Sequence, residues 1–97
     1  MHNTIDDIEL IKDTLIWAVE RRSDMYVNLD VQYVKISSEG DDWMVFEICY
    51  LDGDEDRETW MTLHEDGREK MWEVGVESFS NLETAVGYAM MISRPVK

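Results

Sequence analysis

Three aspartates at alternate positions, Asp52, Asp54 and Asp56, have the spacing of the first ligands of a calcium-binding loop. That loop also needs a glycine at position 6, where this chain has Arg57, and a bidentate glutamate at position 12, where it has Leu63. One cysteine and two distant histidines give no ligand set for zinc. The sequence therefore predicts no metal site and no cofactor.

His64 is the candidate general base in the folded part of the chain, and four carboxylates could orient it: Glu47, Glu65, Asp66 and Glu73. We find no nucleophile-elbow motif and no glycine-rich phosphate loop. Cys49 lies mid-strand among acidic residues, a setting that raises a thiol pKa. A paired-carboxylate hydrolase stays open in so acidic a chain, but no pair stands out, and we expect a non-enzyme.

Charge is the strongest signal in these 97 residues, because 22 acidic residues against 9 basic ones give a formal net charge of −13. Residues 39–58 contribute −8 of it, with nine carboxylates against Arg57 alone. Such charge disfavours direct contact with nucleic acid or an anionic membrane, and it steers a basic protein partner toward this segment. The simpler interpretation, a solvated loop, also stays open.

Apolar residues at three- and four-residue steps predict a helix from Thr4 to about Ser23, capped by Asn3 or Thr4. Leu10 and Trp17 form a ridge beside its apolar stripe. We expect this ridge to seal the helix against a sheet, and the alternative is a contact with a partner or a second copy. A final helix opens with Ser80-Asn81-Leu82-Glu83, a capping-box pattern, and stops at Arg94-Pro95.

Between the helices, period-2 alternation predicts four strands, which are roughly Val31–Ser37, Trp43–Leu51, Glu58–His64 and Glu69–Val76. Short turns join them, including the acidic turn after Leu51 and a hairpin signal at Glu65-Asp66-Gly67. The predicted fold class is α+β: one domain, residues 1–97, with a four-stranded antiparallel meander and both terminal helices packed on one face (α-β-β-β-β-α).

Alternation also sorts the strand residues between the two faces of the sheet. The predicted core face holds Val34, Ile36, Met44, Phe46, Ile48, Tyr50, Met61, Leu63, Trp72, Val74 and Val76. Two helices cannot cover both faces, so we expect the opposite face to show its apolar side chains among Glu47 and Glu73. The alternatives are cross-strand packing pairs without further function and a homodimer formed through this face.

We expect charge and apolar anchors to form one surface that captures a basic protein. Asp41 and Asp42, from what we take to be a neighbouring turn, would assist the acidic turn, while tryptophan and methionine side chains anchor the partner. The predicted partner-binding residues are Asp41, Asp42, Trp43, Glu47, Asp52, Asp54, Glu55, Asp56, Glu58, Trp60, Met71 and Glu73.

In size, charge and architecture the whole chain resembles the small acidic immunity proteins of bacterial toxin and immunity pairs, including contact-dependent growth inhibition. The resemblance implies a stoichiometric inhibitor of a toxin domain, often a basic nuclease, with carboxylates in the nuclease cleft. The four tryptophans resemble those of immunity proteins for tRNA-cleaving toxins that work with elongation factor Tu, which implies that this factor could join the complex.

Two other acidic classes fit the charge: phage inhibitors of CRISPR or restriction complexes that mimic nucleic acid, and secretion chaperones. The chaperones usually carry a middle helix that this chain lacks. The start of the sequence lacks a secretion-signal pattern and no apolar run approaches membrane-spanning length, so we expect a cytoplasmic protein, monomer or homodimer.

Overall fold

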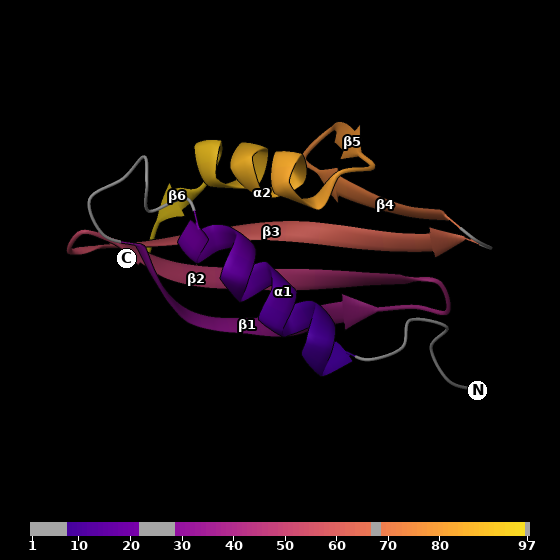
Figure 1. Cartoon of the computed structure of the whole chain (residues 1–97), viewed down its shortest axis with the longest axis horizontal. Helices are drawn as coiled ribbons and strands as arrows, with labels where there is room; N and C mark the ends of the chain where they lie inside the picture. Colours follow the sequence, from indigo (N-terminus) through magenta and orange to yellow (C-terminus); the bar gives the residue numbers. More distant parts are fainter. Residues whose placement is uncertain (1–7, 22–28, 67–68, 97) are drawn as a thin grey trace.

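The computed structural model describes residues 8–21, 29–66 and 69–96. Its elements follow the order α1 (Ile8–Glu20), β1 (Leu29–Glu39), β2 (Trp43–Asp52), β3 (Glu55–Asp66), β4 (Glu69–Val74), β5 (Glu77–Phe79), α2 (Leu82–Met91) and β6 (Arg94–Pro95) (Figure 1). The α+β class, the antiparallel sheet and the two flanking helices are confirmed. The predicted first turn at residues 4–7, the cap at Asn3 or Thr4, Ser23 and Gly67 lie outside the described residues.

The strands pair antiparallel in the order β1-β2-β3-β4-β5, as a meander requires. Two short strands were not predicted. β5 extends the sheet beyond β4, and β6 returns to β3, where Arg57 faces Pro95 and Glu58 faces Arg94. β4 occupies the same edge of β3 further along, from Thr62 to Asp66. The edge of β3 is therefore shared by two strands that lie far apart in the sequence.

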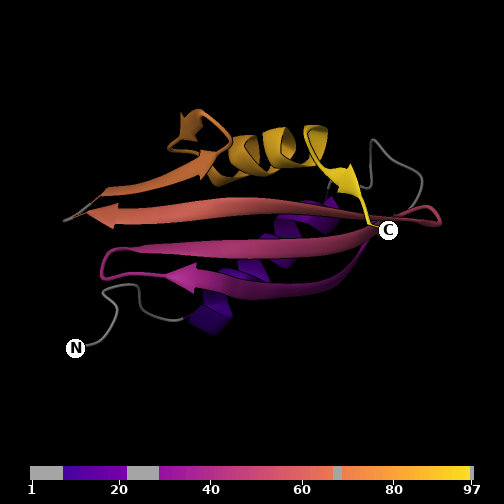
Figure 2. The ribbon, with the colours of Figure 1, turned by 180° about the vertical axis from the view of Figure 1, so that it is seen from behind.

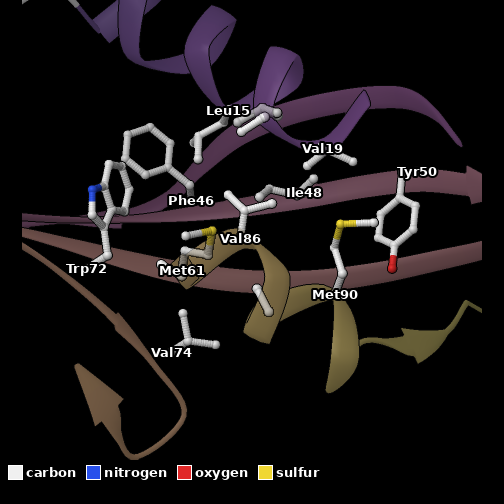
Figure 3. Packing of buried hydrophobic residues seen from close by; sticks show 14 of the residues in the cluster. Leu15, Val19, Phe46, Ile48, Tyr50, Met61, Trp72, Val74, Val86 and Met90 are labelled. Carbon is white, nitrogen blue, oxygen red and sulfur yellow. The ribbon is translucent and has the colours of Figure 1, made fainter. Parts of the chain in front are cut away.

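Both helices lie on one face of the sheet: α1 crosses β1 and β2, and α2 lies over β3 and β4 (Figure 1). Seen from behind, the ribbon shows the other face of the strands with neither helix in front of it (Figure 2). The side chains between helices and sheet form one hydrophobic cluster, in which Leu15 and Val19 of α1 and Val86 and Met90 of α2 meet the strands (Figure 3).

The predicted core face is confirmed at all but one of its positions, with Ile36 only partly buried. Val76 is the exception, since 91% of it is exposed. The chain leaves the sheet after Val74 through a turn in which Gly75 takes φ 62°, a left-handed conformation that glycine adopts readily. The strand therefore ends before Val76 can point into the core.

The helices differ from expectation in two details. The side chain of Asn81, rather than Ser80, caps α2 by accepting a hydrogen bond from the Thr84 backbone at 2.9 Å. Leu10 and Trp17 do not seal α1 to the sheet, because 58% and 52% of these residues are exposed on the outer side of the helix. Neither described helix is long and apolar enough to cross a membrane.

Candidate partner-binding site

The acidic turn forms the end of the β2–β3 hairpin, and we call Asp52, Gly53, Asp54, Glu55 and Asp56 the hairpin tip. Asp52 pairs with Glu55 across the hairpin, and Gly53 takes φ 69° to close the turn. The side chains of Asp54, Glu55 and Asp56 are exposed. A regular two-stranded register therefore holds several carboxylates at one end of a well-packed sheet.

A buried hydrogen-bond network braces the tip from the helix side. Ser93 Oγ accepts from Tyr50 Oη at 2.9 Å and from Arg57 Nε at 2.8 Å, and it donates to the Met90 carbonyl at 2.8 Å. Arg57 Nη2 also donates to the Ser93 carbonyl at 2.6 Å. Arg57, the one cation of the acidic segment, thus ties the hairpin to the end of α2. Burial raises the pKa of Tyr50, which keeps its hydroxyl a donor in this network.

Apart from Asp41 and Asp42, the carboxylates predicted to bind a partner fall into two groups. Four are paired within the protein: Glu47 with Lys35, Glu55 with Arg57, Glu58 with Arg94, and Glu73 with His64. Among the described residues, no cation pairs with Asp52, Asp54 or Asp56. Three carboxylates without a cation among the described residues therefore lie together at the hairpin tip, where they are available to an outside cation.

Trp60 lies on the open face of β3, the face without helices, and Arg94 covers its ring. The Arg94 guanidinium carbon is 4.7 Å from the ring centroid, and its Nε donates to Glu58 Oε2 at 3.1 Å. A hollow of about 330 Å³ adjoins this group, lined by Glu58, Thr59, Trp60, Gly75, Ile92 and Arg94. The indole is half-buried in the middle of β3, opposite Glu47, and Glu58 lies between it and Asp56 on the same strand face.

Asp41 and Asp42 do not lie beside the hairpin tip, which corrects the expectation of a neighbouring turn. They belong to the β1–β2 turn, whereas the tip follows β2, and the ten residues of β2 separate the two by about 30 Å. Trp43 and Met71 also lie at the far end, on either side of His64. The twelve predicted residues are therefore spread along the sheet, with Glu47 and Trp60 paired midway between the two turns, rather than gathered at the tip.

Trp43 is packed against its own turn. A Cβ atom added at Gly40 would overlap the Trp43 indole, so the ring lies directly over that backbone. Its cross-strand partner on β3 is His64, whose Nε2 lies 2.8 Å from Glu73 Oε1. These contacts fit the alternative of cross-strand packing at this end of the open face.

A second polar group lies on β1 and β2 in the middle of the open face. Tyr33 Oη donates to Glu47 Oε2 at 3.2 Å, and Lys35 Nζ lies 5.4 Å from the centre of the Tyr33 ring. Desolvation, then the hydrogen bond and the charge of Glu47, raise the pKa of Tyr33 to about 12. Burial raises the pKa of the Cys49 thiol, so its reactive thiolate form is disfavoured.

Exposed apolar side chains after α2 were missed by sequence reasoning. Val96 borders the tip, where its backbone donates to the Asp56 carbonyl at 2.9 Å, and Ile92 lies further along, beside Trp60 and Gly75. The sequence predicts only that the last helix stops at Arg94-Pro95, whereas in the structure these two residues form β6. Pro95 was the available signal, since proline is tolerated on an edge strand.

No protein-family model, curated protein or solved structure matches this chain. Interpretation of the site therefore depends on its own geometry. Within residues 8–21, 29–66 and 69–96, no group of three or more His, Cys, Asp or Glu side chains is arranged to hold a metal ion. A larger hollow of about 620 Å³ lies beside α2; it is lined mainly by uncharged residues such as Phe79, Tyr88 and Met91, and by none of the unpaired aspartates.

Proposed function

We propose that this chain is a non-catalytic binding protein that captures a basic protein partner at the hairpin tip. The observation that carries the proposal is the separation of charge. Glu47, Glu58 and Glu73 on the open face are paired internally, whereas the three aspartates of the tip, Asp52, Asp54 and Asp56, have no cation among the described residues. Unpaired carboxylates on a rigid hairpin attract a cationic surface and cost little reorganisation on binding.

The partner class that fits best is the nucleic-acid-binding cleft of a nuclease toxin domain, which would make this chain a cytoplasmic immunity protein. Such a cleft is lined with lysine and arginine for phosphate contacts. A projecting hairpin end with carboxylates in place of phosphates is complementary to it. Exposed Val96 beside the tip, and Ile92 beside Trp60, supply apolar contact area of the kind that extends the lifetime of a complex.

Co-expression with the product of the neighbouring gene tests this function. We expect a one-to-one complex on size-exclusion chromatography and loss of the partner's nuclease activity at equimolar ratio. The control is a triple variant with the same change in net charge away from the tip: Asp13→Asn, Glu69→Gln and Glu77→Gln. The test variant combines Asp52→Asn, Asp54→Asn and Asp56→Asn and should inhibit poorly. Equal inhibition by the test variant and the control would contradict the proposal.

A second function, mimicry of nucleic acid against a CRISPR or restriction complex, is favoured by one observation. Acidic turns lie at both ends of an elongated molecule of 41 × 23 × 22 Å, with Asp41 and Asp42 opposite the tip. A mimic would use both ends at once. Neutralising Asp42 and Glu39 should then weaken binding to the large complex as much as neutralising the tip, whereas an immunity protein should tolerate that change.

A further inference from the structure

Three aromatic rings on the surface of this protein share one arrangement. Each has one of the chain's own cations over its face, and each of those cations also contacts a carboxylate. Arg21 lies 4.9 Å from Trp17 and pairs with Glu83, and Lys35 lies over Tyr33 and contacts Glu47. The third set is Trp60, Arg94 and Glu58. An aromatic face next to a carboxylate recognises a guanidinium by stacking and by charge-assisted hydrogen bonds.

The set at Trp60 differs from the other two in its surroundings. Asp56 lies on the same face of β3 as Trp60 and Glu58. It is two residues from Glu58, so the two carboxylates are separated by roughly 7 Å along the strand. The set at Trp60 also adjoins the hollow lined by Thr59, Gly75 and Ile92, which has room for an aliphatic stem. Stacking surface, paired carboxylate, unpaired carboxylate and space therefore meet at one point.

Arg94 holds this position through its side chain alone. Its side chain is 68% exposed, whereas that of Glu58 is only 20% exposed. The backbone around it is fixed separately, by the Ser93 network on one side and by the Val96–Asp56 hydrogen bond on the other. The guanidinium can therefore turn into solvent without unpairing β6. An exposed ion pair and an exposed cation–π contact oppose this movement only weakly.

We propose that Trp60 and Glu58 form an arginine-binding subsite, which Arg94 fills in the free protein and which an arginine of the basic partner takes over on binding. The incoming guanidinium stacks on Trp60 and bridges Glu58 and Asp56, while its stem enters the adjoining hollow. Arg94, once displaced, points to solvent at the edge of the interface. The inference rests on the proposed capture of a basic partner and names the side chain that is recognised.

The test uses N-acetyl-arginine amide as the probe and the Trp60 indole N–H signal as the readout in nuclear magnetic resonance. In Arg94→Ala the signal should shift saturably with the probe, at least threefold more tightly than in the native protein, where Arg94 competes. N-acetyl-lysine amide should bind Arg94→Ala several-fold more weakly, because an ammonium lacks the planar fork. If Arg94→Ala is not folded, Arg94→Gln replaces it.

Arg94→Ala combined with Glu58→Gln should lose most of this affinity, whereas the charge-matched Arg94→Ala with Glu77→Gln should keep it. Equal, non-saturating shifts in the native protein and the Arg94 variant would overturn the proposal, as would equal affinities of the two double variants. Because the probe needs no partner protein, its failure is distinguishable from failure of the proposed function, which is measured by complex formation.

Discussion

Arg57 is the one cation in the acidic segment, and its guanidinium contacts three oxygen atoms of Ser93 and Glu55. From the sequence, it only reduces the charge of residues 39–58. In the structure, it joins the hairpin to the chain after α2, and Tyr50 donates to the same Ser93 hydroxyl. A charge count cannot reveal this role, because it depends on a serine that lies 36 residues away.

Ser93→Ala should lower the free energy of unfolding by about 1–3 kcal/mol, because it leaves buried donors of Tyr50 and Arg57 without their acceptor. Chemical denaturation measures this loss. The control is Ser78→Ala on the exposed edge strand β5, which should have an effect within about 0.5 kcal/mol of zero. Similar losses in the two variants would mean that the network does not brace the tip.

Tyr33, on the open face of β1, makes the stability of the folded protein depend on pH at high pH. Its pKa is raised from 10.0 to about 12 in the folded protein, so the folded state binds the phenol proton more tightly than the unfolded state. The stability from this group is complete below pH 10 and is lost as pH rises toward about 12. Tyrosinate absorbance and thermal melting should show a late transition that Tyr33→Phe removes. An unchanged profile in that variant would contradict the assignment.

The elements explain which parts of the site could be predicted. Period-2 alternation placed Phe46, Ile48 and Tyr50 correctly, because side chains two apart on a strand share the face that the helices cover, although Cys49 on the other face is buried too. β5 and β6 were missed because two or three residues are too few for a pattern. The separation of Asp42 from the tip follows from the predicted meander itself, since successive turns of a meander lie at opposite ends of the sheet.

Two glycines in turns should respond to alanine in different ways. Gly75→Ala should cost about 1–2 kcal/mol through its left-handed backbone alone, since an added Cβ meets only Ile92, at 3.7 Å. Gly40→Ala should instead displace the Trp43 ring. Denaturation and the indole N–H signals distinguish them: only the Gly40 variant should shift the Trp43 signal strongly. A Trp43 signal unchanged by Gly40→Ala would show that the ring does not lie over this turn.

Trp60 and Trp43, both on the open face, should contribute differently to the affinity for the partner. Trp60→Leu should shorten the lifetime of the partner complex, with a loss of about 2 kcal/mol or more, because the ring lies beside Glu58 in the proposed arginine-binding subsite. Trp43→Leu should change binding by less than about 0.5 kcal/mol, since its ring lies at the end of the sheet opposite the tip. Dissociation rates from surface-bound partner measure both. A larger effect from Trp43 would place the interface on the far end of the open face.

At the scale of the whole molecule, the formal charge of −13 is carried by a protein 41 Å long, and it is not spread evenly along that length. Composition alone predicted a basic partner, alternation predicted the strands, and the short turns between them predicted their antiparallel arrangement. Which carboxylates are left for that partner could not be predicted, because pairs such as Glu58 with Arg94 form between segments far apart in sequence. The charge that composition reveals is thus divided by the fold into an internal part and an available part.

The association rate of the complex as a function of salt concentration tests the central claim, that the hairpin tip captures the partner. Neutralising Asp52, Asp54 and Asp56 to asparagine should slow association about tenfold or more at low salt and flatten its salt dependence. The charge-matched variant at Asp13, Glu69 and Glu77 should keep most of both. Equal rates and equal salt slopes in the two variants would contradict the account, because net charge rather than the tip would then attract the partner.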